Sequence, residues 1–231
     1  MHLLSNTLFL RIASSLILIP VVMGAIISGG WFFALFVAIA FGLTCAEWFQ
    51  LTRNNNRSLF YLLLGLVYFS ISYLQFEYMR LFIENGVYLT LVCMFMIWGS
   101  DTGAYIFGKN FGGALMSPTI SPKKTWSGMA GAMIGASFAF TALLYAAPYL
   151  NHFIPNTLNP DLSQLPFLIV LSLMMGYVGQ VGDLLMSAMK RKACVKDSGQ
   201  LIPGHGGILD RIDSLLLVIP IFVIVARYVL N

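Results

Sequence analysis

Charge is scarce in this chain. Asp, Glu, Lys and Arg together make up 10% of its 231 residues, whereas 58% are hydrophobic and the mean hydropathy is +0.83. A soluble globular domain carries far more charge on its surface, so the composition excludes that class. The net charge of +4 is divided among several short segments, which argues against a nucleic-acid-binding surface and suits an anionic lipid or substrate.

Cysteine is also rare and follows no pattern. The three cysteines are Cys45, Cys93 and Cys194, and the first two lie in apolar runs. An odd, scattered set argues against both a disulfide framework and a zinc site. Cys194 shares a loop with His205, but a single Cys/His pair is a weak metal signal, and an ordinary thiol is the simpler interpretation. The chain also lacks internal repeats and low-complexity linkers.

Apolar runs long enough to cross a bilayer, about 20 residues each, recur along the whole chain. We therefore predict an all-α, polytopic integral membrane protein with about seven transmembrane helices. The predicted spans are residues 12–28, 31–50, 59–76, 87–108, 126–147, 166–188 and 214–230.

The polar content of the spans divides the chain near residue 85. Residues 1–85 are predicted to be N-terminal transmembrane helices with few polar side chains. Glu47 lies near the end of its span and is interpreted as a structural residue that snorkels or caps. Residues 86–231 are predicted to be the catalytic transmembrane region.

The basic residues predict the orientation in the membrane. Eleven of the thirteen Lys and Arg residues fall at the N-terminus or in alternate loops, 51–58, 109–125 and 189–213, whereas loop 148–165 has none. By the positive-inside rule the N-terminus and these three loops are cytoplasmic, and loop 148–165 is external. The bacterial inner membrane is the expected location, with the functional residues facing the cytoplasm.

The stretch 187–213 concentrates the chemistry. Its 27 residues hold eight charged side chains and a Gly-rich turn, Pro203-Gly204-His205-Gly206-Gly207, whose backbone amides could approach an anion. Cations, carboxylates and such a turn together indicate metal-assisted chemistry on phosphates. A basic loop that only fixes topology is the alternative, but it needs neither H-G-G nor D-R-x-D.

Two carboxylates, Asp101 and Asp183, interrupt apolar spans. An ionisable residue inside a membrane is a functional hypothesis by default. The alternative is a hydrogen bond between packed helices, helped by neighbouring glycines. Asp101 and Tyr105 share a helix face. The face of Asp183 continues through three residues toward the loop, Ser187, Lys190 and Arg191.

A second pair of carboxylates, Asp210 and Asp213, begins the last span and shares one helix face. Asp183 and Asp210 could approach from neighbouring helices and hold a hard cation through oxygen. The pair could also serve only as a helix cap and dipole partner, although one carboxylate would suffice for that. In loop 109–125, Lys123 and Lys124 could contact phosphates or act only as topology markers.

The stretch 187–213 resembles the signature of the phosphatidate cytidylyltransferase (CDP-diacylglycerol synthase) family. Every fixed position is filled: Ser187, Lys190-Arg191, Lys196-Asp197, Pro203, His205-Gly206-Gly207 and Asp210-Arg211-Ile212-Asp213. Two more segments, 100–109 and 121–126, look like family motifs. In the first, Lys109 stands where Arg is common, and after the second Gly131 is followed by Ala132 rather than by another glycine. The resemblance covers roughly residues 86–231, and the chain is short for the family.

This resemblance implies the reaction of CTP with phosphatidic acid to give CDP-diacylglycerol and pyrophosphate, with Mg²⁺ required and a second cation left open. It also implies a homodimer and a place in phospholipid biosynthesis. The expected metal ligands are Asp183, Asp210 and Asp213. The expected catalytic residues are Lys190, Arg191, Lys196, Asp197, His205 and Arg211. The expected substrate-binding residues are Ser187, Asp101, Tyr105, Lys123, Lys124, Thr125, Gly206 and Gly207.

Three alternatives differ in the features they require. Transfer of cytidylate to another lipid phosphate, such as an archaeal ether lipid, would use the same loop motifs. The CDP-alcohol phosphatidyltransferases use a run of aspartates beginning D-G-x-x-A-R, which this chain does not have. A transporter with Asp101 and Asp183 on its pathway would place polar residues across several spans, and it leaves H-G-G and D-R-x-D unexplained.

Overall fold

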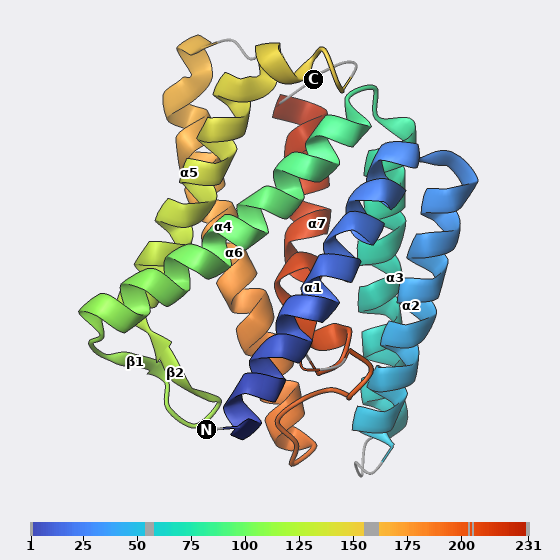
Figure 1. The fold of residues 1–231 in the computed structure, drawn as a ribbon, viewed down its shortest axis with the longest axis vertical. Helices are drawn as coiled ribbons and strands as arrows, with labels where there is room; N and C mark the ends of the chain where they lie inside the picture. The colour runs from blue at the N-terminus through green and yellow to red at the C-terminus, as the bar shows by residue number, and fades with distance from the viewer. Residues whose placement is uncertain (1, 54–57, 155–161, 203, 205, 230–231) are drawn as a thin grey trace.

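The computed structural model describes residues 2–53, 58–154, 162–202, 204 and 206–229. Within these residues the chain forms seven long helices (Figure 1). They are α1 (His2–Ser28), α2 (Gly30–Thr52), α3 (Ser58–Phe82), α4 (Gly86–Phe111), α5 (Trp126–Leu150), α6 (Leu165–Lys192) and α7 (Leu209–Val229), with a 3-10 turn, η1 (Leu162–Gln164), before α6. Each predicted span falls within one of these helices, except that residue 230 of the last span lies outside the described residues.

By length and composition, five of the described helices, α2 to α6, can cross a membrane. In α1 the apolar part is the shorter segment Ile12–Ser28, and α7 carries Asp210, Arg211 and Asp213 in its first turns. The all-α membrane class is therefore confirmed for the bundle, whereas seven crossings and a cytoplasmic N-terminus stay predictions.

The segment predicted as loop 109–125 contains a β-hairpin. Strand β1 (Leu115–Ser117) pairs antiparallel with β2 (Ser121–Thr125), with Leu115 opposite Thr125 and Ser117 opposite Ser121. Helix α4 runs to Phe111 and stops at Gly112, whose φ of 57° suits glycine. Consequently Lys109 lies in the last turn of α4, and Lys123 and Lys124 lie on a strand.

Helices α4 and α5 touch backbone to backbone through four glycines. A methyl group at Gly103 would overlap the carbonyl of Gly131, and one at Gly135 would overlap the carbonyl of Gly99. Small residues four apart on each helix allow this approach. The contact fixes the stretch of α4 that carries Asp101 against the helix that follows the hairpin.

Two apolar clusters fill the bundle. The larger surrounds Tyr88, Val92 and Met96 of α4 and includes Val218 and Phe222 of α7. The smaller joins the N-terminal helices to the C-terminal ones, and its buried members are Trp48, Leu51, Phe69, Met186, Leu209 and Leu216. Contacts therefore cross the boundary placed at residue 85, including a 2.6 Å hydrogen bond from Ser72 Oγ of α3 to the Leu216 carbonyl of α7.

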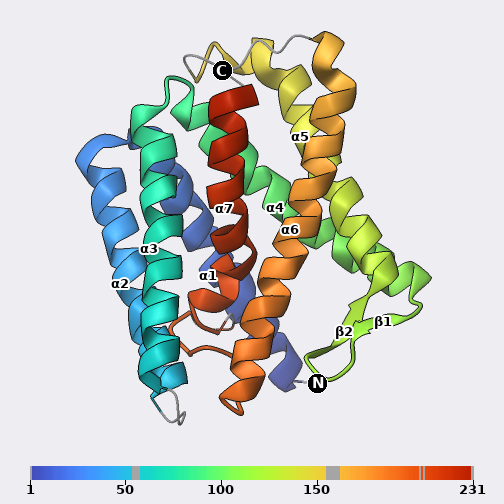
Figure 2. The same cartoon turned by 180° about the vertical axis from the view of Figure 1, so that it is seen from behind.

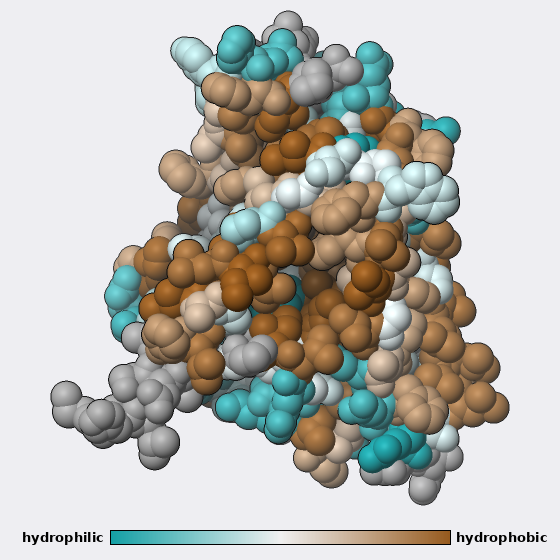
Figure 3. Space-filling model, turned by 45° about the vertical axis from the view of Figure 1, so that its right-hand side comes forward, coloured by the Kyte–Doolittle hydropathy of each residue, from teal (hydrophilic) through white to brown (hydrophobic). Residues whose placement is uncertain are grey.

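The surface agrees with a membrane protein. Figure 3 shows hydrophobic side chains over much of the side of the molecule and hydrophilic ones gathered toward its two ends. The hairpin, the C-terminal end of α6 and the start of α7 lie at the same end as the N-terminus, as both ribbon views show (Figures 1 and 2). The candidate residues of the hairpin, α6 and α7 are thereby brought to one end of the bundle.

Candidate active site

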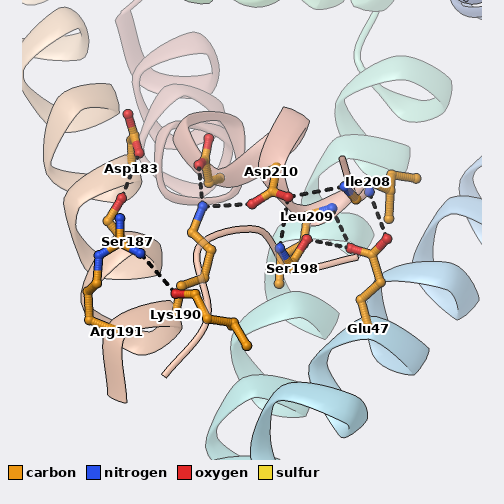
Figure 4. Close-up of polar contacts among 12 residues, drawn as sticks. Glu47, Asp183, Ser187, Lys190, Arg191, Ser198, Ile208, Leu209 and Asp210 are labelled. Atoms are coloured by element: carbon orange, nitrogen blue, oxygen red, sulfur yellow. Dashed lines mark hydrogen bonds and ion pairs between the residues drawn. The ribbon is translucent and has the colours of Figure 1, made fainter. Parts of the chain in front are cut away.

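A lysine on α6 joins the two carboxylates that begin α7. Lys190 Nζ lies 2.7 Å from Asp210 Oδ1 and 3.9 Å from Asp213 Oδ2 (Figure 4). All three side chains are largely buried, with Lys190 8% exposed. The expectation that Asp210 and Asp213 share one helix face is confirmed, because both meet the same ammonium group.

The second oxygen of Asp210 organises the α6–α7 loop (residues 193–208). Asp210 Oδ2 accepts hydrogen bonds from the backbone amides of Ser198 (2.8 Å) and Gly207 (3.1 Å). Burial alone would raise the pKa of Asp210, but the hydrogen bond and charge of Lys190, with the two amides, bring that pKa below its ordinary value. Asp210 is therefore held as a carboxylate.

A second lysine–carboxylate pair links the hairpin to α6. Lys124 Nζ of β2 lies 2.7 Å from Asp183 Oδ2 and donates to the side-chain oxygen (3.0 Å) and the carbonyl (3.3 Å) of Gln180. Asp183 Oδ1 accepts a 3.2 Å hydrogen bond from Ser187, one turn further along α6. The predicted face of α6 is thus confirmed for Asp183 and Ser187.

This second pair lines a cavity of about 220 Å³ between α4, the hairpin, α5 and α6. Asp101, Tyr105, Lys123 and Thr125 line it too. The hydroxyl of Thr125 accepts from the Gly128 amide at 3.1 Å, so this residue caps α5 while it faces the cavity. Tyr105 is exposed, and its hydroxyl accepts a hydrogen bond from Lys109 at 3.3 Å.

The carboxylates of the two pairs lie within electrostatic reach of one another. The charges of Asp183 and Asp101 both act on Asp213, and those of Lys124 and Arg211 act on Asp101. In the part of the chain that the structure describes, no three acidic, His or Cys side chains converge into a ready metal cage. The donor set, made of carboxylate oxygens alone, is nevertheless of the kind that a hard divalent cation prefers.

The amide of Gly207, which ends the glycine turn, donates to Asp210, and the next two amides, of Ile208 and Leu209, donate to Glu47. Contact between the turn and phosphate oxygens stays a prediction. A side chain at Gly207 would overlap Ser198 and Glu47. Glycine is required at position 207 because Ser198 and Glu47 occupy the space that a side chain would need.

The remaining predicted residues lie around this centre. Arg191 donates to the carbonyl of Ile120 in the hairpin (3.1 Å) and to that of Val195 (2.9 Å). Lys196 and Asp197 are exposed on the α6–α7 loop, and Asp197 lines a separate cavity of about 480 Å³. Arg211 is exposed on the first turn of α7. Gly206 has a φ of 85°, and Pro203 and His205 lie outside the described residues.

Sequence reasoning missed three residues of the site: Glu47, Gln180 and Ser198. Gln180 stands three residues before Asp183 inside an apolar span, and that spacing was a usable signal. Glu47 was interpreted as structural, and it does cap a helix, but the helix is α7 and not its own. Ser198 gave no signal, because its role depends on contacts with residues far away in the sequence.

Known proteins with similar sequences identify the family. Residues 9–84 and 57–229 match the model of the Cytidylyltransferase family. The chain belongs to this family. The match reaches well into the N-terminal half, beyond residues 86–231 to which the motifs pointed, and so includes α2 and Glu47.

Several relatives of this cytidylyltransferase family member carry one name. A phosphatidate cytidylyltransferase of Rickettsia felis is 37% identical over 224 residues, which cover 94% of this chain and 91% of that protein. Its Rickettsia bellii counterpart is 34% identical over 223 residues, 94% and 89% of the two chains. The Haemophilus influenzae phosphatidate cytidylyltransferase is 44% identical over 138 residues, 60% of this chain and 45% of that one.

Proposed function

We propose that this chain transfers a cytidylyl group from CTP to phosphatidic acid, giving CDP-diacylglycerol and pyrophosphate in phospholipid biosynthesis. One observation supports this proposal above the others. Two lysine–carboxylate ion pairs, Lys124–Asp183 and Lys190–Asp210, lie at the same end of an apolar helical bundle. Similarity to the phosphatidate cytidylyltransferases supports the choice of substrates.

The reaction brings two anions together. An oxygen of the lipid phosphate attacks the α-phosphorus of CTP, a new P–O bond forms, and pyrophosphate leaves with the electrons of the broken bond. The attacking phosphate is already ionised, so no strong general base is needed. Positioning and charge neutralisation supply most of the catalysis, which is the work that Lys124, Lys190 and Arg211 are placed to do.

We propose Mg²⁺ as the cofactor, held by Asp183, Asp210 and Asp213. When bound, such an ion would neutralise charge on the triphosphate. Asp183 and Asp213 already lie within electrostatic reach of each other. Both oxygens of Asp210 have partners, so this residue would share Oδ1, the oxygen that meets Lys190.

A transporter is the less supported alternative. It requires polar side chains that face one another across several spans. Among the described residues, the ion pairs formed by Asp183, Asp210 and Asp213 instead lie where the hairpin, α6 and the start of α7 meet, at one end of the bundle.

The test of the proposed function is an assay of purified protein in mixed micelles with CTP and phosphatidic acid. We expect pyrophosphate and CDP-diacylglycerol in equal amounts, with no release when diacylglycerol replaces phosphatidic acid. Removal of divalent ions with a chelator should stop turnover, and added Mg²⁺ should restore it. Absence of pyrophosphate release in the complete mixture would reject the proposal.

We also propose a homodimer, as the resemblance to the phosphatidate cytidylyltransferases implies, in the bacterial inner membrane. The site should face the cytoplasm, because the basic loops alternate along the chain. A cysteine introduced at position 156 should react with an impermeant thiol reagent added outside intact cells. Native Cys194, which is exposed on the α6–α7 loop, should react only after the cells are opened. The reverse pattern would overturn the orientation.

A further inference from the structure

Glu47 of α2 receives three hydrogen bonds from the α6–α7 loop and the first residue of α7. Its Oε1 accepts from the Ile208 amide at 2.8 Å, and its Oε2 accepts from the Leu209 amide at 3.0 Å and from Ser198 Oγ at 2.8 Å (Figure 4). The side chain is 5% exposed. One carboxylate therefore ties the early part of the α6–α7 loop to its end.

The contact also explains why α7 can begin where it does. The first amides of a helix need acceptors, and the residue before Leu209 is Ile208, whose side chain offers none. Glu47 supplies the acceptor from another helix, and its negative charge suits the positive end of the α7 dipole.

Two glycines of the loop lie so close to the Glu47 side chain that any larger residue would clash with it. A methyl group at Gly199 would lie 2.8 Å from Glu47 Oε1, and one at Gly207 would overlap Oε2. The loop therefore leaves room for Glu47 at two positions, Gly199 and Gly207. A side chain that only touched the outside of the loop would not need this room.

The hydrogen bonds lead from Glu47 to the reacting centre in two steps. Ser198 donates its hydroxyl to Glu47 and its amide to Asp210. In the turn before α7, the Gly207 amide goes to Asp210 while the following two go to Glu47. Asp210 in turn holds Lys190 at 2.7 Å. Hydrogen bonds therefore connect Glu47 through Ser198 and through the turn before α7 to Asp210, and through Asp210 to the lysine.

We propose that Glu47 is a positioning residue for the phosphate chemistry, which acts through Asp210 and Lys190 and not on the substrates. This inference rests on the proposed function. Glu47 meets Asp210 through Ser198 and through the turn before α7, so it is assigned a place behind the site and no contact with metal or phosphate. Its role is to keep the loop closed in the form that aligns the lysine–carboxylate centre.

The test compares Glu47→Gln with Glu84→Gln, a control in the exposed connection between α3 and α4. Glu47→Gln keeps the size of the side chain but replaces one acceptor oxygen by a donor. We expect kcat to fall about tenfold to a hundredfold, as for a small displacement of catalytic groups, with each KM within about threefold of the starting value. Glu84→Gln should leave both unchanged. A residue that only stabilises the bundle would reduce the folded fraction and leave kcat per folded molecule intact.

A second variant covers the case in which Glu47→Gln does not fold. Ser198→Ala removes one hydroxyl donor to Glu47 and keeps the amide that binds Asp210. It should lower kcat about threefold to tenfold, since it removes one hydrogen bond of this linkage. Unchanged kcat in Ser198→Ala or in folded Glu47→Gln would overturn the inference.

A readout independent of activity separates this inference from the proposed function. Trypsin cleavage after the exposed Lys196, followed by mass spectrometry, reports opening of the loop. Cleavage should be at least about fivefold faster in Glu47→Gln or Ser198→Ala than in Glu84→Gln, because the loop has lost a hydrogen bond that ties its ends. Faster cleavage in a protein that never releases pyrophosphate would reject the proposed function alone. Equal cleavage rates would reject the role of Glu47.

Discussion

The two lysine–carboxylate pairs of the site differ in how firmly they are held. The Lys190–Asp210 pair is nearly buried, with side chains 10% and 8% exposed, and two loop amides bind the same carboxylate. The Lys124–Asp183 pair is more open, at 15% and 29%, and it lines a cavity. Partners that are buried and fully bonded exchange slowly, whereas an open ion pair can exchange one partner for a ligand at little cost.

This difference assigns separate tasks to the two sides of α6. The α7 side has a fixed geometry, set by the loop and by Glu47. The hairpin side is where substrate can displace Lys124 from Asp183, because that lysine comes from a short strand and that carboxylate faces a cavity. Substitutions on the two sides of α6 test this assignment.

Loss of either carboxylate charge should have the largest effect. Asp183→Asn and Asp210→Asn should each lower kcat about a thousandfold or more, since an amide has no charge for the metal or for its lysine. Both proteins should stay folded in detergent. Only Asp210→Asn should lower the melting temperature, by about 2–4 °C, because it disturbs buried hydrogen bonds. Near-normal activity of Asp183→Asn at ordinary Mg²⁺ concentration would remove that residue from the ligand set.

Alanine substitutions of the three consecutive cations at the end of α6 should lower kcat by different amounts. Lys190→Ala should lower kcat about a hundredfold, because it leaves Asp210 and Asp213 buried without their cation. Arg191→Ala should cost about tenfold through loss of the link between the hairpin and the α6–α7 loop. Lys192→Ala should cost about twofold at most, since that side chain lies over the Tyr61 ring.

Replacement of Arg191 by lysine tests whether this residue acts through directed hydrogen bonds or only through its charge. The guanidinium donates from two nitrogens to carbonyls of different segments, and an ammonium on a shorter reach cannot keep both bonds. Arg191→Lys should therefore resemble Arg191→Ala in steady-state kinetics. Equal losses at positions 190, 191 and 192 would mean that the cations act only as a diffuse field.

The two lysines of the hairpin offer a matched comparison. Lys124→Ala should lower kcat/KM about tenfold to thirtyfold, because it removes a partner of Asp183 that is also placed to meet a phosphate. Lys123→Ala, at an exposed neighbouring position, should stay within about threefold. The loss in Lys124→Ala should fall mainly on the KM of one substrate if this side exchanges ligands. A loss confined to kcat would assign Lys124 to the fixed side.

The smallest expected effect is the dependence of the melting temperature on pH, which reports the charge of Asp210 in the Lys190–Asp210 pair. The pKa of Asp210 is lowered in the folded protein, so its stabilising effect is complete above the ordinary carboxyl value of about 3.9 and disappears as the pH falls through the lowered pKa. The melting temperature of the unsubstituted protein should exceed that of Asp210→Asn from pH 7 to about pH 5, and the gap should close below about pH 4. A gap that persists at lower pH would show that charge is not its source.

The helices were predictable because a bilayer span is a local property. About 20 consecutive apolar residues suffice to identify one, and each predicted span lies on a helix of the structure. The hairpin was not predictable in this way. Its strands are three and five residues long, with Pro122 inside the second, and both fall below what periodicity can detect.

The contacts of the site fall into the same two groups, those that a local sequence pattern predicts and those that only the fold produces. Contacts between residues three or four apart, such as Asp183 with Ser187, follow from helix geometry and were predicted. The direction of Arg191 was not, because its guanidinium meets a hairpin carbonyl that only the fold brings close. Glu47 lies 161 residues before Ile208 along the chain, and no pattern within a window of sequence connects them.

That same separation has a consequence for the making of the protein. A ribosome adds about 5–20 residues per second, so α2 is synthesised roughly 8–32 seconds before the amides it will cap. During that interval the Glu47 carboxylate has to remain hydrated at the edge of the bilayer, since its burial without donors would be unfavourable. The catalytic centre thus forms only when α7 arrives, and a nascent chain that lacks α7 has no assembled site with which to engage nucleotide or lipid.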